Sequence, residues 1–193
     1  MDHSDVRSLR WLRTHEAIRY AYFDLLSQTG SSDVTISQIA SHAHIHRKTF
    51  YLHYNSIEDL YDDCVNVLAQ RYSEAIASLP QPFDYYSLSQ AMFEFFSSNP
   101  RLEKILSSSK LRHFTDDLVR HTTRNSRALY NPYREFSEAK QELINTFVVY
   151  SSVNVWRRWI MSGKKVPQDE AVKLLGDLLE HGVSPLRAPY EQH

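Results

Sequence analysis

The feature that most limits the fold of this chain is long helical periodicity combined with very little glycine. Apolar residues recur three and four positions apart over many stretches, which is typical of amphipathic helices. Only four of the 193 residues are glycine, and strand-rich folds and phosphate-binding loops need more. Seven prolines and several Asn and Ser clusters separate the helical stretches instead. We therefore expect an all-α protein with about nine helices.

Composition narrows the class of protein further. The single cysteine, Cys64, allows no internal disulfide, which fits a reducing compartment. The N-terminal stretch MDHSDVRSLRWLRTHEAIRY is charged throughout, and no apolar run approaches the ~18 residues that span a membrane. We expect a cytoplasmic protein with neither a signal peptide nor membrane contact. The formal net charge is −1, so any nucleic-acid surface must be a local patch.

The N-terminal part predicts three helices that end in a helix-turn-helix. The first helix is expected from about Asp5 to Ser27. Thr35 and Gln38 have the spacing of a capping box, so a second, short helix should start after Thr35. Residues 43–45 then form a turn, and His46 occupies the N-cap of a third helix. Two short helices joined by about three residues are typical of a helix-turn-helix.

The rest of the chain predicts a larger helical body. Ser56 caps a fourth helix, and Pro100 follows Asn99 at another helix start. A long helix is expected over residues 133–161, and its apolar residues exceed one face. Such a helix must be covered on two sides, which favours a partner subunit. A last helix is expected over residues 168–181.

The stretch HAHIHRKTFYLHY, residues 42–54, raises the possibilities of a metal site, a catalytic cluster or a nucleic-acid surface. His42 and His46 would share a face of a continuous helix, but the expected turn lies between them. The stretch holds no Cys, Asp or Glu to complete a ligand set. No Ser or Cys lies in a nucleophile motif. We expect no metal, no cofactor and no catalytic residue, and the chain is not expected to be an enzyme.

The same stretch favours a nucleic-acid surface. Arg47, Lys48 and Thr49 lie in the first turn of the third helix, where cations and backbone N–H groups favour phosphate. Tyr51 and His53 project from the same exposed side, and both can form hydrogen bonds with phosphate oxygens. The side chains expected to anchor this helix in the bundle are Phe50, Leu52 and Tyr54.

These residues resemble the TetR family of transcriptional regulators. The sequence VTISQIASHAHIHRKTFYLHYNSIEDLYDD, residues 34–63, is similar to the helix-turn-helix of that family and the start of its fourth helix. The Phe- and Trp-rich C-terminal part resembles the subgroup related to dihydroxyacetone-kinase regulators. The matching positions are Ile39-Ala40, Ala43, Ile45, Thr49-Phe50-Tyr51, His53-Tyr54 and Asp59-Leu60.

The resemblance implies a homodimer that binds operator DNA, most often as a repressor, and that responds to a small-molecule effector of unknown identity. Residues 1–55 would form a three-helix bundle with the helix-turn-helix. Residues 56–193 would form a larger helical domain for effector binding and dimerisation. The residues expected to contact DNA are Thr35, His46, Arg47, Lys48, Thr49, Tyr51 and His53.

Three positions depart from the family pattern. His44 stands where the family has a turn glycine, and histidine tolerates positive φ less well than glycine. His46 replaces a serine N-cap, and Ile57 replaces a lysine that commonly contacts phosphate. These changes bear on DNA affinity and sequence preference. Because His53 is expected to face phosphate, DNA binding should also depend on pH.

Two further sets of residues are predicted in the C-terminal body. Pockets and cores use the same aromatic residue types, so the pocket set rests on residue type alone. The expected pocket residues are Phe93, Phe96, His113, Phe114, His121, Phe147, Tyr150 and Asn154. The expected dimer interface, from the last two helices, consists of Val149, Val153, Trp156, Ile160, Leu174, Leu175 and Leu178.

An alternative function stays open on the same fold. The chain could be an architectural DNA-binding or protein-interaction protein without a small-molecule effector. An enclosed cavity in the C-terminal body would favour the ligand-responsive regulator. A filled core with an exposed groove would favour the alternative.

Overall fold

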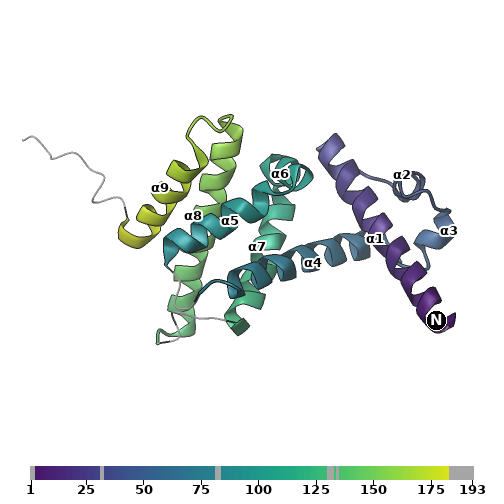
Figure 1. The fold of residues 1–193 in the computed structure, drawn as a ribbon, viewed down its shortest axis with the longest axis horizontal. Helices are drawn as coiled ribbons and strands as arrows, with labels where there is room; N and C mark the ends of the chain where they lie inside the picture. Colours follow the sequence, from purple (N-terminus) through teal and green to yellow (C-terminus); the bar gives the residue numbers. More distant parts are fainter. Residues whose placement is uncertain (1–2, 31–32, 81–83, 130–132, 134, 183–193) are drawn as a thin grey trace, which may run out of the picture. The chain divides into compact units, whose positions relative to one another are not determined.

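The computed structural model describes residues 3–30, 33–80, 84–129, 133 and 135–182. Within these ranges the chain forms nine helices and no strand, which confirms the all-α prediction (Figure 1). The helices are α1 (His3–Thr29), α2 (Ile36–His42), α3 (Arg47–Phe50), α4 (Ile57–Ala77), α5 (Tyr85–Ser97), α6 (Pro100–Ser107), α7 (Arg112–Leu129), α8 (Glu138–Met161) and α9 (Gln168–His181).

The predicted helix starts at Ser56 and Asn99 are confirmed by their capping hydrogen bonds. Ser56 Oγ accepts from the backbone N–H of Asp59 at 3.1 Å, and Asn99 Oδ1 accepts from that of Arg101 at 3.0 Å. The predicted start of the long helix at Tyr133 is wrong, because α8 begins at Glu138. A turn precedes it, in which the N–H of Phe136 donates to the carbonyl of Tyr133 at 2.9 Å.

The chain divides into two compact units, and α4 and α7 each contribute residues to both. Unit 1 comprises Met1–Ala69 and Asn99–His121, and unit 2 comprises Gln70–Ser98 and Thr122–His193. Unit 1 therefore contains the expected DNA-binding residues 1–55 together with α6 and parts of α4 and α7. The proposed functional boundary between residues 55 and 56 stays a prediction.

Unit 1 is built around α1. In Figure 1, α2 and α3 lie to one side of α1, and α6 also packs against it. Ile18 of α1 and Ile39 of α2 are fully buried, as are Phe50 of α3 and Leu60 of α4. Each short helix thus gives at least one large apolar side chain to the core, and this burial positions the helix-turn-helix.

Unit 2 has an aromatic core. The ring of Phe93 lies 5.2 Å from that of Trp159, and the ring of Phe96 lies 5.4 Å from that of Trp156. The indole N–H of Trp159 donates to the carbonyl of Val166 at 2.7 Å, which satisfies its polar atom inside the unit. These tilted rings fill space between α5 and α8, while α5 also packs along α9.

Candidate nucleic-acid interface

The helix-turn-helix has the local geometry that the sequence predicts. Thr35 caps α2, and its hydroxyl accepts from the N–H of Gln38 at 3.3 Å. The Gln38 side chain accepts from the N–H of Thr35 at 2.8 Å, which completes the capping box. The turn that follows places His44 at a φ of 53°, and the N–H of Ile45 donates to the carbonyl of Ala40 at 2.9 Å. The departure from glycine at residue 44 therefore leaves the turn intact.

Helix α3 presents its two cations to solvent. Arg47 and Lys48 are exposed, while Phe50 in the same four-residue helix has no exposed surface. Tyr54 is also buried, as expected for an anchor. Leu52 is not an anchor, because its side chain is 77% exposed. The α-helix ends at Phe50, so the following turn directs Leu52 outward and breaks the helical spacing on which that prediction relied.

The remaining predicted DNA-contact residues differ in exposure. Thr35 and His46 are exposed, and His46 forms no side-chain capping bond to α3. Tyr51 is 48% exposed, and Thr49 is half-buried. The exposed residues Thr35, His46 and Tyr51 flank α2 and α3 at their ends, as expected of contact residues. Their contacts with DNA stay predictions.

His53 belongs to a cluster of rings between α1 and the end of the helix-turn-helix. Its Nδ1 lies 3.3 Å from Nδ1 of His15. Trp11 stacks on His15 with ring centroids 4.6 Å apart, and its ring is 4.9 Å from that of His53. The ring of His15 in turn stacks on Tyr54 at 4.8 Å. His53 is therefore half-buried, and one of its nitrogens is engaged inside the protein.

Asp63 of α4 completes this cluster. The hydroxyl of Tyr54 donates to Asp63 Oδ2 at 2.6 Å, and His15 Nε2 lies 3.2 Å from the same oxygen. Arg19 Nη1 donates to it at 3.4 Å. Burial raises the pKa of Tyr54, and the hydrogen bond to Asp63 adds to this effect. Burial also lowers the pKa of His15, against the opposing charge of Asp63.

A second polar cluster joins α6 to α1 and α2. Arg101 of α6 donates through Nε to Asp24 of α1, and its guanidinium lies 4.5 Å from the ring centroid of Tyr20. His42 Nε2 lies 2.8 Å from the other oxygen of Asp24, and Gln28 donates to that oxygen at 2.6 Å. The hydrogen bond from Arg101 holds the pKa of Asp24 below its ordinary value. One carboxylate thus links three helices of unit 1.

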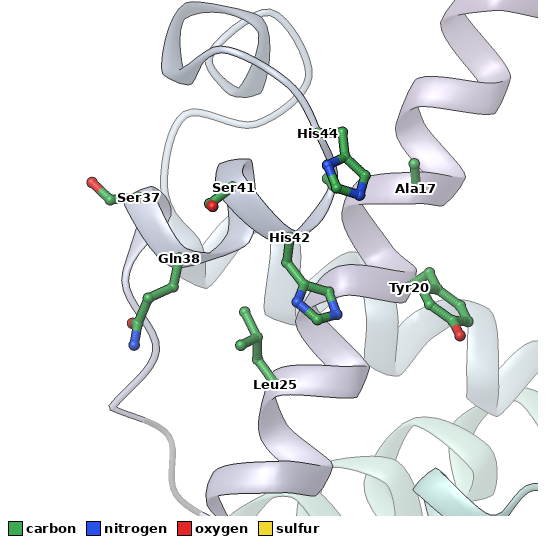
Figure 2. Close-up of a pocket in the computed structure, with 9 residues that line it drawn as sticks. Ala17, Tyr20, Leu25, Ser37, Gln38, Ser41, His42 and His44 are labelled. Carbon is green, nitrogen blue, oxygen red and sulfur yellow. The ribbon is translucent and has the colours of Figure 1, made fainter.

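A surface pocket lies beside this cluster, between α1 and α2. Figure 2 shows the lining residues Tyr20 and Leu25 on α1 and Gln38 and His42 on α2, with His44 in the turn that follows. Its volume is about 880 Å³. None of the residues predicted for the effector lines it.

The predicted effector residues are not brought together within either unit. His113, Phe114 and His121 belong to unit 1, and the other five belong to unit 2. Phe114 is fully buried, and His121 Nδ1 lies 2.6 Å from the side-chain oxygen of Asn66. Phe93 and Phe96 pack against tryptophans in the core. Phe147, Tyr150 and Asn154 are exposed on α8, and the assignment of all eight residues to a pocket stays a prediction.

The predicted dimer residues also divide by burial. Val153, Trp156 and Leu175 are 7%, 0% and 1% exposed in one chain, so they form part of the core of unit 2. The prediction assigned them to a partner because sequence periodicity cannot separate a core face from an interface face. Leu174 is 44% exposed, while Val149, Ile160 and Leu178 are half-buried. For these four, the interface assignment stays a prediction.

The sequence did not predict the cluster around Asp63 or the cluster around Asp24. Trp11 and His15 are spaced by one helical turn on α1, which was the available signal for a shared face. Their partners are 38 or more residues away in sequence, and no local pattern pairs them. In the described part of the chain, no three His, Cys, Asp or Glu side chains are grouped to hold a metal ion. Likewise, no described helix has the length and apolar character to cross a membrane.

The all-helical fold with an N-terminal helix-turn-helix defines a class of transcriptional regulators. Residues 20–64 match the family model of bacterial regulatory proteins of the tetR family. Residues 84–181, more than half of the chain, match that family's model of a transcriptional regulator C-terminal region. The chain therefore belongs to the tetR family of transcriptional regulators.

Solved structures share this fold at low sequence identity. FadR from Bacillus subtilis, in complex with stearoyl-CoA, is 15% identical with a TM-score of 0.66, covering 86% of this chain and 98% of that one. A tetR-family transcriptional regulator from Streptomyces coelicolor is 17% identical with a TM-score of 0.60, covering 92% and 86%. The dihydroxyacetone kinase operon activator DhaS is 15% identical with a TM-score of 0.52, covering 86% and 94%. No curated protein matches the sequence.

Proposed function

We propose that this regulator is a homodimeric repressor that binds operator DNA through α3 and is released by a small molecule. The observation that carries the DNA-binding part is the arrangement of α3. Arg47 and Lys48 are exposed on α3, and the fully buried Phe50 anchors this helix in the core. The backbone that carries the two cations is therefore held in place. The whole chain carries a net charge of −1, so overall charge would not attract DNA. Phosphate binding therefore depends on a local cationic surface such as this one.

An exposed apolar face on α8 supports the homodimer. Leu143 is 72% exposed and Phe147 is 58% exposed, one helical turn apart. Tyr150 and Met161 continue the set of exposed apolar side chains on α8, and Leu174 adds one on α9. Large apolar side chains grouped on a surface commonly mark an interaction site. Two copies of α8 and α9 would cover this face in a four-helix arrangement.

The dimer is tested by charge substitution at exposed positions. Phe147→Asp with Leu174→Asp should give monomers in sedimentation velocity, because the charges would be buried at the interface. Lys165→Asp, in the turn between α8 and α9, is a control that places a negative charge away from the proposed face by reversing an existing positive one. A double variant that stays dimeric would remove this face from the interface. Val153 and Leu175 are unsuitable for the test, because charges there would disrupt the core of unit 2.

Buried hydroxyl groups in unit 2 support a small-molecule effector. Ser73, Ser89 and Thr122 have hydroxyls with no hydrogen-bond partner among the described residues. A buried polar group without a partner costs about 1–3 kcal/mol, and a polar ligand or water would remove that cost. FadR from Bacillus subtilis binds stearoyl-CoA in its crystal structure, so an acyl-CoA thioester is a reasonable first compound to test here.

The experiment is a selection of bound duplexes from a random DNA pool, followed by effector release. We expect the selected sites to be inverted repeats whose half-sites are roughly 34–36 Å apart, because a dimer presents two recognition helices. Stearoyl-CoA and other metabolite classes are then added to the complex. Recovery of no preferred sequence would contradict operator binding. Tight binding that no tested metabolite weakens would favour the architectural alternative.

A further inference from the structure

His15 and His53 are in contact through their Nδ1 atoms, which are 3.3 Å apart. We propose that His15 is a positioning residue that fixes the proton of neutral His53 on Nδ1, so that contact between His53 and a DNA phosphate requires uptake of one proton. This proposal rests on the proposed DNA binding and deepens it. It is carried by the hydrogen-bond geometry of His15, His53, Tyr54 and Asp63.

The neighbours of His15 determine which of its ring nitrogens carries a proton. Tyr54 has one hydroxyl proton, which it donates to Asp63 at 2.6 Å. The Tyr54 oxygen also lies 2.9 Å from His15 Nε2, and here it can only accept. Asp63 Oδ2, at 3.2 Å from the same nitrogen, is likewise an acceptor. His15 Nε2 therefore carries a proton that faces two oxygen acceptors.

This constraint extends to His53. A neutral imidazole has one N–H, so neutral His15 with a protonated Nε2 has a bare Nδ1 that accepts. That Nδ1 lies 3.3 Å from Nδ1 of His53, which must then donate. Neutral His53 consequently has its lone pair on Nε2. No described residue forms a hydrogen bond with this nitrogen.

The surroundings favour the neutral form of the pair in the free protein. The charged and titratable groups around it are Arg19 and Glu16 on α1, Tyr54 after α3 and Asp63 on α4. Burial lowers the pKa of His53, and the positive charge of protonated His15 lowers it further. Burial likewise lowers the pKa of His15. Two imidazoles in contact resist double protonation, so the pair takes up a single proton.

One added proton changes what His53 offers to DNA. A phosphate oxygen only accepts hydrogen bonds, so it is not matched by a bare Nε2. If the proton enters His53, both of its nitrogens donate. If it enters His15, both nitrogens of that ring donate, His53 Nδ1 accepts, and the proton of neutral His53 moves to Nε2. Either arrangement supplies an Nε2–H donor together with one positive charge on the pair.

The pH dependence follows from this coupling. DNA phosphate stabilises the protonated pair, so the pair has a higher pKa in the complex than in the free protein. Affinity then rises as pH falls through the window between these two values. It is constant above the higher value and below the lower one. Uptake of one proton strengthens binding by at most about tenfold per pH unit within the window.

The proton positions are tested directly by imidazole nitrogen NMR of the free, full-length protein at pH above the titration. We expect the proton of His15 on Nε2 and that of His53 on Nδ1. In His15→Phe the acceptor is absent, and we expect the proton of His53 to move to Nε2. His15→Leu, which also lacks an acceptor, is a second variant with the same expected result if the phenylalanine disturbs the packing. A proton on Nε2 of His53 in the wild type overturns the proposal.

The coupling is tested with a labelled random-sequence duplex of roughly 30 base pairs, about three helical turns, at low and fixed salt. Affinity is measured from about pH 5.5 to 8 for the wild type, His15→Phe and a control, His181→Gln, at the end of α9. We expect the wild type and the control to show the same slope. His15→Phe should show a shallower slope and tighter binding than wild type at pH 8.

The results distinguish loss of proton coupling from loss of DNA binding. Equal slopes for the wild type and His15→Phe overturn proton coupling while leaving DNA binding intact. Absence of duplex binding by the wild type at every pH contradicts the proposed function and the coupling that rests on it. In that case the NMR measurement still decides whether His15 fixes the proton of His53.

Discussion

The two units of this regulator hold their helices together by different means. In unit 1, Asp24 and Asp63 each accept hydrogen bonds from residues on other helices, and both lie close to histidines. In unit 2, aromatic rings pack around Trp156 and Trp159, and helices approach closely at Gly176. Polar links respond to pH, whereas packed apolar surfaces respond to changes in side-chain volume. The unit proposed to contact DNA is therefore the one expected to respond to protons.

The largest effect is expected from removing volume in unit 2. Trp156 has no exposed surface and lies 5.4 Å from the ring of Phe96. Trp156→Ala should lower the free energy of unfolding by about 3–5 kcal/mol, because it leaves a large cavity in a packed core. Urea denaturation followed by circular dichroism measures the change. Trp11→Ala in unit 1 is the matched control, and it should cost less because Trp11 is 46% exposed.

A smaller loss is expected from adding volume in unit 2. Glycine to alanine inside a helix ordinarily stabilises by about 1 kcal/mol. At Gly176 of α9, a Cβ would lie 3.0 Å from the Cα of Tyr86 and 3.3 Å from its backbone nitrogen. These backbone atoms cannot move without displacing α5 from α9. Gly176→Ala should therefore destabilise by about 1–3 kcal/mol, and a variant with a raised melting temperature would refute close packing at this point.

The smallest of these effects on stability is expected from a polar link in unit 1, and it should depend on pH. The hydrogen bond from Arg101 lowers the pKa of Asp24 in the folded protein. The link therefore stabilises the fold at pH values above the pKa of an unfolded aspartate, about 3.9. This stabilisation is lost as pH falls through the lower pKa of folded Asp24. Asp24→Asn should therefore be less stable than wild type at pH 7, with the difference shrinking as pH falls below about 3.9.

An exposed ion pair in unit 2 should show no such dependence on pH. Asp177→Asn alters a surface pair in which Asp177 is 45% exposed and Lys173 is 70% exposed. Because solvent screens such a pair, we expect little change in unfolding free energy at either pH. Denaturation curves for both variants at pH 7 and pH 3 provide the test. An equal pH dependence at the two positions would remove the distinction drawn between the units.

The sequence predicted features that depend on neighbouring residues. The capping box at Thr35, the turn at His44 and the buried Phe50 all depend on local spacing, and the structure has each of them. The link between Asp24 and Arg101 joins residues 77 positions apart, so no local pattern shows it. The prediction of the eight pocket residues likewise rested on residue type alone. Aromatic residues occur in cores and pockets alike, and only the fold distinguishes Phe93 in the core from Phe147 at the surface.

The dependence of DNA binding on α3 is the central claim, and a charge-matched pair of double variants tests it most directly. Affinity for a selected operator duplex is measured by fluorescence anisotropy over a range of salt concentrations. Arg47→Ala with Lys48→Ala removes two cations from α3, and Lys164→Ala with Lys165→Ala removes two from the turn after α8. The α3 variant should lose about 1–3 kcal/mol of binding free energy for each base contact removed. For each phosphate contact removed, the slope of log affinity against log salt concentration should decrease by about 1. The other variant should bind almost as wild type does, whereas equal weakening of both would show that binding follows overall charge and would contradict the claim.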